Sequence, residues 1–493
     1  MTAGPAAGDS AGTEPAGDVH TERADTGTEP TGNTSAAPAG NTGAEPGADT
    51  AAAPTPPLGR NYWRLFTSSA LTNFGDGLMS VAVVWLATAL TRDPLWITVV
   101  GLASRLPWLL FSLPAGVITD RYDRRYLVAA MDVVRFAAVG AFAVVLLVHQ
   151  QGLPTPAELA AGAPEPDQST LLLIALTALA VILGFAEVLR DNTAQTLLPS
   201  VVDQRLLEKA NGRMWGAETA LNNFVGPPLA GFLVALAITV PFGANAVFLG
   251  ISAVLIAGLS GSFRPRGGPN GPRGRISWRA EIGAGLSWLW RHRLLRSLAL
   301  LLGASNFAGA IPMVLFVLFA QDVLGLFEGW QFGLLLTGMA TGAIAGSLVA
   351  ERIVARLTEG RCLLLALVTF AVGYGATGLL SSAPVVWLMS VLIGLAIVTW
   401  NVITVSLRQR IIPDHLLGRV NSVYRFFGWG TISVGTLLGG LLVTWLEPAV
   451  GREWALRFPF LLAAALSALL VPYAWTRVNN TAIQQARAAA IDP

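Results

Sequence analysis

Long apolar stretches recur along most of the chain, separated by short polar segments that carry Arg, Gly or Pro. Each stretch is about 20 residues long, the length that an α-helix needs to cross the core of a bilayer. The runs are continuous rather than alternating, which excludes a membrane β-barrel and predicts helices whose backbone hydrogen bonds are satisfied within each span. We predict twelve spans, at residues 62–90, 94–118, 125–148, 169–193, 211–238, 241–262, 296–321, 329–350, 362–381, 384–410, 419–446 and 454–476.

The composition agrees with a membrane protein. Hydrophobic residues make up 53% of the chain and charged residues only 13%, against about 25% charged residues in an ordinary soluble domain. Cys362 is the only cysteine, and the four histidines fall in predicted loops or tails. We therefore expect no disulfide, no metal site and no cofactor.

Basic residues gather in the loops after the even-numbered predicted spans. These loops hold Arg121, Arg124, Arg125, Arg205, Lys209, a run from Arg264 to Arg296, Arg352, Arg356, Arg361 and Arg419. The loops after odd-numbered spans hold little more than Arg92 and Arg452. By the positive-inside rule this asymmetry predicts that both termini are cytoplasmic, which requires an even number of spans.

The chain divides into five segments by composition. Residues 1–57 carry eight acidic residues against one arginine and almost no large apolar residue, so we predict a disordered acidic N-terminal tail. Two six-helix halves follow at 58–263 and 296–478, joined by a cytoplasmic linker at 264–295, with a C-terminal tail at 479–493. The linker arginines are more typical of charge beside anionic lipid than of nucleic-acid binding.

An internal repeat supports two related halves. Asp120-Arg121 followed by Arg125 recurs as Glu351-Arg352 followed by Arg356. Similarly, Leu-Leu-Glu-Lys-Ala-Asn at 206–211 recurs as Leu-Leu-Gly-Arg-Val-Asn at 416–421. Two matches in the same order at equivalent loops indicate duplication, a common plan among secondary transporters. The predicted fold is all-α, with two pseudo-symmetric six-helix halves.

The loop between the second and third spans carries a specific motif. The run Gly116-Val-Ile-Thr-Asp120-Arg121-Tyr-Asp-Arg124-Arg125 resembles the loop signature of the major facilitator superfamily, in the branch that includes siderophore (enterobactin) and macrolide exporters. The resemblance covers residues 60–478 and departs at Asp123, where the family often has Gly. It implies the major facilitator fold, with Asp120 and Arg124 as gate residues that contact the other half. The alternative is that these arginines only fix the topology.

The fifth span contains Gly226-Pro227-Pro228-Leu229-Ala230-Gly231, which resembles the Gly-Pro motif associated with exporters in the same superfamily. The resemblance favours export over import. From the residues alone, the small side chains permit close helix approach and the prolines bend the span at a point that can act as a hinge. A plain packing kink is the other interpretation.

Several polar side chains fall at mid-depth in the predicted spans, where an ionisable group costs at least about 2.5–3.5 kcal/mol. They are Asp76, Arg105, Glu218 and Asn306, with Asn222 one helical turn from Glu218. A carboxylate at Asp76 or Glu218 that binds and releases a proton would couple transport to the proton gradient. The alternatives are a permanent ion pair between Asp76 and Arg105 and a bond from Glu218 to a neighbouring helix.

A second set of charges lies nearer the cytoplasmic ends of the spans. Asp132 and Arg135 are three residues apart on one helix, as are Glu187 and Arg190, so each pair shares a helix face. We expect a structural charge network here that opens and closes with the gate. Arg425, in the eleventh span, is expected to belong to it.

These features predict a proton-coupled antiporter that exports a drug, siderophore or secondary metabolite by alternating access. Import by proton symport is the alternative. The chain lacks a Gly-x4-Gly-Lys-Ser/Thr phosphate loop, which excludes direct use of ATP. A membrane enzyme would need convergent catalytic or metal-binding groups, and a sensor would need a folded signalling domain, neither of which the sequence indicates. Lys209 is its only lysine beside many arginines, a composition typical of high-GC bacteria. We expect a monomer in a bacterial plasma membrane, with small-molecule substrate, protons and lipids as partners and no nucleic acid.

Overall fold

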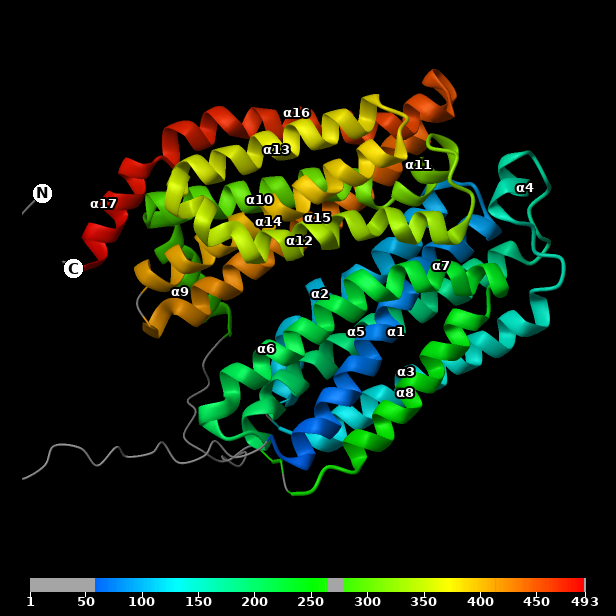
Figure 1. Cartoon of the computed structure of the whole chain (residues 1–493), viewed down its shortest axis with the longest axis horizontal. Coiled ribbons are helices and arrows are strands. Elements are labelled where there is room, and N and C mark those ends of the chain that lie inside the picture. Colours follow the sequence, from blue (N-terminus) through cyan, green and yellow to red (C-terminus); the bar gives the residue numbers. More distant parts are fainter. Residues whose placement is uncertain (1–57, 120, 262, 265–277, 413, 492–493) are drawn as a thin grey trace, which may run out of the picture. The chain divides into compact units, whose positions relative to one another are not determined.

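The computed structural model describes residues 58–491 apart from 120, 262, 265–277 and 413. The predicted tail at 1–57 therefore lies outside the described residues, as does Asp120. Within the described part of the chain every regular element is a helix and there is no strand (Figure 1).

Twelve helices in this part are long and apolar enough to cross a membrane, which confirms the predicted number. The spanning helices are α1 (Arg60–Leu90), α2 (Pro94–Thr119), α3 (Arg124–His149), α5 (Ser169–Val201), a composite of α6 (Leu207–Glu218), the π-helix η2 (Thr219–Val225) and α7 (Gly226–Leu236), then α8 (Val240–Ala257), α10 (Arg293–Met313), α12 (Gly329–Leu357), α13 (Glu359–Leu379), α14 (Ala383–Ile411), α15 (Asp414–Val450) and α16 (Arg452–Arg477).

Five shorter elements complete the described chain: α4 (Pro156–Ala160), η1 (Gln204–Leu206), α9 (Trp278–Arg291), α11 (Phe316–Asp322) and α17 (Asn480–Ile491). The predicted seventh span at 296–321 is divided between α10, which ends at Met313 directly after Pro312, and α11, which begins at Phe316. Helices α9 and α17 lie within the segments predicted as linker and C-terminal tail.

The outer surface of the bundle is apolar. Among its most exposed side chains are Leu236, Val254, Val148 and Leu469, each at least 70% exposed. A water-soluble protein rarely exposes contiguous apolar surface on this scale, whereas a lipid environment favours it.

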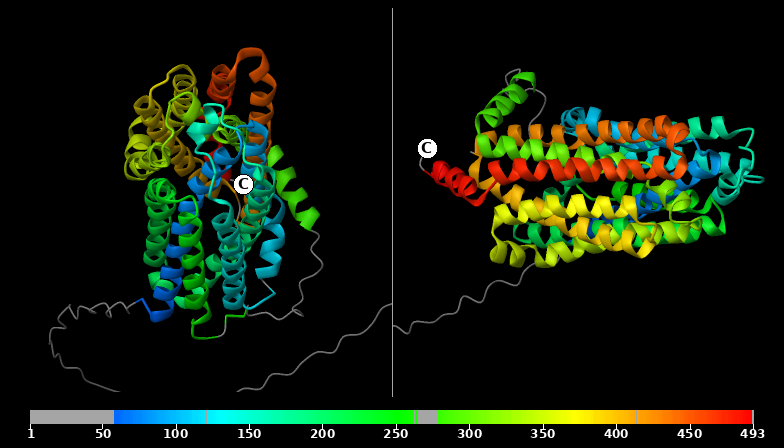
Figure 2. Two further views of the ribbon diagram at one scale, coloured as in Figure 1. Left: turned by 90° about the vertical axis from the view of Figure 1, so that its right-hand side faces the viewer. Right: turned by 90° about the horizontal axis from the view of Figure 1, so that it is seen from above.

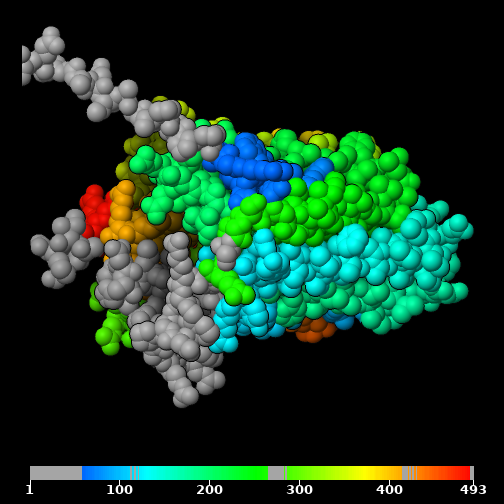
Figure 3. Space-filling model, turned by 90° about the horizontal axis from the view of Figure 1, so that it is seen from below, coloured from blue at the N-terminus to red at the C-terminus, as the bar shows by residue number. Residues whose placement is uncertain are grey.

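Helix packing repeats between the two halves, which we call the N-half (α1–α8) and the C-half (α10–α16). In the N-half α2 packs on α5 and α3 on α8, and the equivalent pairs in the C-half are α12 on α14 and α13 on α16. Figure 3 shows α1, α8 and α3 side by side on one face of the N-half. Between the halves, α7 packs on α12 and α2 on α15, two contacts that a six-helix repeat makes equivalent.

The helices run roughly parallel between two ends of the bundle (Figure 2). We call the end with residues 91–93 and 322–328 the Arg92 end, and the end with residues 202–203, 258–261 and 412 the linker end. At the Arg92 end one continuous hydrophobic core includes residues of both halves, among them Trp85 of α1 and Phe316 and Phe460 of α11 and α16. At the linker end each half has its own core, centred on Tyr62 and Leu197 in the N-half and on Trp400 and Leu367 in the C-half.

Candidate functional site

A buried charge cluster occupies the interior of the N-half, where α1, α3, α5 and α8 meet. Arg190 Nε donates to Asp132 Oδ1 at 2.8 Å, and both side chains are almost fully buried. Asp132 Oδ2 also accepts from the Ser252 hydroxyl at 2.6 Å. Arg135, which is 1% exposed, donates through Nη2 to Asp76 Oδ1 on α1. Residues from three helices thus form two ion pairs, both of which include a residue of α3, and Ser252 of the fourth helix bonds to one of them.

These pairs differ from those that the sequence suggested. Asp76 pairs with Arg135 rather than with Arg105, whose side chain is exposed. Neither pair spaced three apart on one helix is an ion pair in the structure, because these side chains reach across the helix interfaces to partners on neighbouring helices. Asp76 of the expected mid-depth set consequently lies in one cluster with Asp132, Arg135 and Arg190 of the expected cytoplasmic set.

Three further carboxylates belong to the electrostatic surroundings of this cluster: Glu187 and Asp191 of α5, and Glu218 at the end of α6. Glu187 makes no hydrogen bond or ion pair among the described residues, although Arg135 and Arg105 act on it electrostatically. Asp191 accepts from Arg190 Nη1 at 3.3 Å. The carboxylates around the two buried arginines therefore outnumber them, although Asp132 alone is fully buried: Asp76 is 20% and Asp191 38% exposed, and Glu218 is exposed. The sequence reasoning missed Asp191, although a charge inside a predicted span was the available signal.

Arg135 has unused hydrogen-bonding capacity. Its Nε and Nη1 are buried without a partner in the described structure, while Nη2 bonds to Asp76. A buried guanidinium with free donors next to several carboxylates can exchange one carboxylate partner for another at small cost, because the lost bond is replaced. The arrangement is thus suited to rearrange when the protonation state of a nearby carboxylate changes.

Asp76 is held between two glycines that bring neighbouring backbones close. A Cβ on Gly75 would lie 2.0 Å from Asn245 Oδ1 of α8, and one on Gly77 would lie 2.7 Å from the backbone oxygen of Asn222 in η2. Asn222 also donates to Asn73 Oδ1 at 3.4 Å. The glycines therefore place Asp76 against both α8 and the π-helical segment, which connects the cluster to the fifth span.

The π-helix η2 follows from the prolines of the Gly-Pro motif. Pro227 and Pro228 have no backbone N–H to donate to the carbonyls four residues earlier, so the ordinary helical ladder cannot continue through them. The chain adopts a wider π turn over Thr219–Val225 instead. Such π segments within spanning helices are frequent at functional sites.

The rest of the Gly-Pro motif contacts the C-half. A Cβ on Gly231 would lie 2.2 Å from the backbone oxygen of Gly329, and one on Gly333 would lie 2.4 Å from that of Pro227. Helices α7 and α12 therefore touch backbone to backbone near the Arg92 end (Figure 1). The close helix approach that the small residues suggested is made between the two halves.

We expect Gly231→Ala to destabilise the purified protein by about 1–3 kcal/mol, because the added methyl group forces α7 and α12 apart. Thermal denaturation in detergent measures the effect. Gly243→Ala is the control, since a Cβ at Gly243 meets nothing within 4 Å. Equal melting temperatures for the two variants would show that the α7–α12 contact contributes nothing.

The loop motif between α2 and α3 packs its arginines on the N-half. Arg124 Nη1 donates to the carbonyl of Thr196 at 3.1 Å, and Arg125 Nη1 donates to that of Leu259 at 2.6 Å. Thr196 lies in the C-terminal part of α5, and Leu259 lies just after the end of α8. Arg121 is exposed.

Other members of the predicted sites lie apart from this cluster. Asp120 and the side chain of Arg425 lie outside what the structure describes, and Gly116 is helical in α2. Glu351 and Arg352 are exposed, and Arg352 donates only to the carbonyl of Leu348 in its own helix. Asn306 donates to the carbonyl of Gly428 at 3.4 Å, within the C-half.

A polar lock at the Arg92 end joins the halves and was not predicted. Arg92, between α1 and α2, donates to Asp322 and, at 2.5 Å, to Gln321 Oε1 of α11. Gln321 Nε2 donates back to Thr88 Oγ1 of α1 at 3.0 Å. Arg452 Nε donates to Asp322 Oδ2 at 2.9 Å, so one carboxylate holds two arginines. The sequence placed Arg92 and Arg452 only as loop charges.

Comparison with known proteins supports a transporter. The family model described as transmembrane secretion effector matches residues 52–485. The multidrug efflux pump Tap of Mycobacterium tuberculosis is 27% identical over 376 residues, which cover 75% of this chain and 83% of the pump. The Tap pump of Mycolicibacterium fortuitum is 25% identical over 416 residues, covering 82% and 95%.

Solved structures share the fold. A bacterial homologue of the iron transporter ferroportin, in an inward-facing state, has a TM-score of 0.61 at 20% identity and covers 84% of this chain and 98% of its own. The nucleoside transporter NupG has a TM-score of 0.62 at 13% identity and covers 85% and 99%. With its twelve apolar helices and bacterial relatives, the chain is a multi-pass protein of the bacterial plasma membrane that carries a small-molecule substrate and is not an enzyme. It belongs to the transmembrane secretion effector family of major facilitator transporters.

Proposed function

We propose that this transporter exports a moderately apolar small molecule by alternating access, and that proton binding in the N-half charge cluster drives the cycle. The observation that carries the proposal is the excess of carboxylates over arginines around Arg135, in the interior of a transporter whose halves share a core at one end only. The named relatives, which are multidrug efflux pumps, support export.

The linker end is the cytoplasmic end in this proposal. The arginines of the loops and helix ends gather there, among them Arg121, Arg125, Arg205 and Arg356, while the Arg92 end has Arg92 and Arg452. The positive-inside rule then orients both termini toward the cytoplasm. In this orientation the shared core and the Arg92 lock close the external side, and the separate cores at the linker end leave the halves free to part on the cytoplasmic side.

The proton site in this proposal is built from carboxylates of the cluster, without metal or histidine. Asp76 accepts from Arg135, while Glu187 has no hydrogen-bond partner among the described residues. A proton that neutralises Glu187 leaves both arginines paired, whereas a proton on Asp76 releases Arg135 toward the remaining carboxylates. Release of Arg135 from Asp76 would alter the neighbouring contact of Gly77 in α1 with Asn222 in η2, next to the α7–α12 interface. Proton binding is thereby linked to α7 and α12, the helices through which the two halves contact each other.

Alternating access requires that a ligand binds one of the two conformational states more tightly than the other. A ligand with equal affinity for both states does not change their populations. In the outward-open state the Arg92 lock and the Gly231–Gly329 contact separate. Protons from outside would reach the cluster in the outward-open state and would be released to the cytoplasm in the inward-open state. Substrate leaves when protons enter, which is antiport. Arg124 and Arg125, together with Asp120, would close the cytoplasmic side, as the loop motif implies.

We expect Glu187→Gln and Asp76→Asn to abolish substrate-induced collapse of the pH gradient in everted membrane vesicles, while Glu218→Gln reduces it. A panel of antibiotics, dyes and siderophores is added to energised vesicles, and the internal pH is followed by quenching of a weak-base dye. The matched control is Glu208→Gln, which removes an exposed carboxylate at the linker end.

Three outcomes are informative. A compound that collapses the gradient with the native chain and Glu208→Gln, but not with Glu187→Gln or Asp76→Asn, supports antiport through the cluster. Transport that stays proton-coupled in every variant contradicts the assignment of these carboxylates, although the protein is then still a proton-coupled transporter. Accumulation of substrate in right-side-out vesicles, dependent on the proton gradient, would instead establish import by symport.

A further inference from the structure

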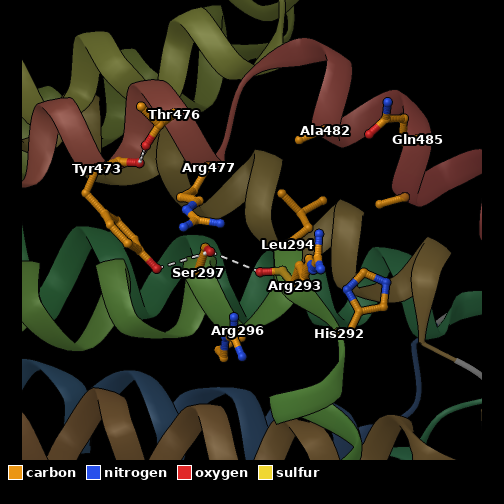
Figure 4. Close-up of a pocket in the computed structure, with 11 residues that line it drawn as sticks. His292, Arg293, Leu294, Arg296, Ser297, Tyr473, Thr476, Arg477, Ala482 and Gln485 are labelled. Carbon is orange, nitrogen blue, oxygen red and sulfur yellow. Dashed lines mark hydrogen bonds between the residues drawn. The ribbon is translucent and has the colours of Figure 1, made fainter.

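A basic pocket lies at the linker end of the C-half, away from the charge cluster. Its volume is ≈ 410 Å³, and it is bounded by the start of α10, the end of α16 and the helix α17. Arg293 and Arg296 come from α10 and Arg477 from the last turn of α16 (Figure 4). No acidic residue lines the pocket. The transport cycle proposed above makes no use of these residues.

The positive charges of the pocket are largely uncompensated. The guanidinium groups of Arg293 and Arg477 make no hydrogen bond or ion pair among the described residues, and that of Arg296 donates one N–H to the carbonyl of Trp290 at 3.1 Å. Two of the three arginines lie in the first turn of α10, which contains no acidic residue. The positive end of a helix dipole makes cations unfavourable there and anions favourable. An anion in the pocket would therefore relieve repulsion that the protein itself leaves in place.

Two neutral hydroxyl groups form a hydrogen-bonded chain in the same place. Ser297, which is 3% exposed, donates to the carbonyl of Arg293 at 3.0 Å and accepts from the Tyr473 hydroxyl at 3.2 Å. Figure 4 shows these groups pointing toward one another at the floor of the pocket. His292 caps α10 by accepting from the Leu295 N–H at 3.3 Å, and burial lowers the pKa of its imidazole. The pocket charge at neutral pH is accordingly carried by the arginines alone.

The surroundings indicate a position at the membrane surface. Trp290 and Trp475, within four residues of the pocket arginines Arg293 and Arg477, are 46% and 67% exposed. Exposed tryptophans are typical of the interface between hydrocarbon and water, where their rings reach the headgroup level. Farther along α16, Leu469 is 70% exposed and extends an apolar surface from the pocket. A ligand with an anionic head and an apolar tail matches both surfaces.

We propose that this pocket binds a phosphate group, presented by an anionic phospholipid whose acyl chains lie along α16. Guanidinium groups bind phosphate oxygens through paired charge-assisted hydrogen bonds, and basic pockets between spanning helices are known to select anionic headgroups. Free inorganic phosphate offers the same chemistry without the tail, so the source of the phosphate is decided by experiment. The inference is independent of the direction of transport and of the coupling ion.

The test compares the full-length protein with the double variant Arg293→Gln/Arg477→Gln. The matched control, Arg356→Gln/Arg361→Gln, removes two exposed arginines from the same end of the C-half. Each purified protein is titrated with phosphatidylglycerol in phosphatidylcholine micelles, and retained lipid is counted by native mass spectrometry. A parallel titration with inorganic phosphate follows thermal stabilisation. The melting temperature without ligand verifies that every variant is folded.

We expect the native and control proteins to retain phosphatidylglycerol and the pocket variant to bind it about tenfold or more weakly, from the loss of two charge-assisted contacts. Stabilisation by inorganic phosphate at the same pocket would assign the phosphate to a soluble source. Equal lipid retention by the pocket variant and the native protein would overturn the proposal. An equal loss of lipid retention in the pocket and control variants would also overturn the proposal, since it would show that the lipid is attracted by the general surface charge of this end and not by the pocket.

Discussion

Arg190→Met is expected to destabilise the purified protein by about 3–5 kcal/mol, because it leaves the Asp132 carboxylate buried without a charged partner. The Arg190 and Asp132 side chains are 2% and 0% exposed, so water cannot replace the lost bond. Ser252 would still donate to Asp132, but a single hydroxyl compensates only part of a buried charge. Thermal and denaturant unfolding in detergent measure the loss.

The double variant Arg190→Met/Asp132→Leu separates two effects on the free energy of unfolding: the cost of leaving one charge buried without a partner, and the net contribution of the ion pair itself. Replacing both charges by apolar groups is often neutral or stabilising, so we expect the double variant to be more stable than Arg190→Met alone. The control is Glu453→Gln, which breaks a pair between the buried Arg457 and a carboxylate that is 61% exposed. Its cost should stay below about 1 kcal/mol. A double variant as unstable as the sum of both single variants would show that the two charges do not interact.

The fold was predictable because each span is specified locally. A spanning helix satisfies its own backbone hydrogen bonds and needs only length and hydropathy, both of which are read from neighbouring residues. The loop motif at 116–125 then indicated how twelve such helices are arranged. What local patterns did not show was the interruption after Pro312, because a proline within a span either bends the helix or ends a segment according to its neighbours.

The site was predictable only as a set of residue types. Asp76, Asp132, Arg135 and Arg190 were identified by the cost of charge in a membrane, and all four are in the cluster. Which of these residues pair with one another was not predictable, because the pairing depends on how α1, α3, α5 and α8 are rotated against one another. A spacing of three residues identifies neighbours on one helix surface, but these side chains find closer partners across the interfaces. The lock around Asp322 was missed for the same reason.

Asp322→Asn is expected to shift the conformational equilibrium at least about tenfold away from the state in which the Arg92 end is closed. Asp322 holds Arg92 and Arg452 together, and its carboxylate is only 11% exposed. Without its charge, two guanidinium groups repel each other between the halves. The Gln321–Thr88 bond remains, so the closed state is weakened rather than abolished.

Spin-label distances measure this shift at both ends of the molecule. In a Cys362→Ala background, labels at Ala161 and Leu380 report on the Arg92 end, and labels at Gly212 and Gln409 report on the linker end. Asp322→Asn should add a longer distance to the first pair and a shorter one to the second, because alternating access couples the two ends in opposite directions. The control Asp167→Asn removes an exposed carboxylate near the same end and should leave both distributions unchanged. If only the Arg92 end widens, the lock stabilises a local contact and the two ends move independently.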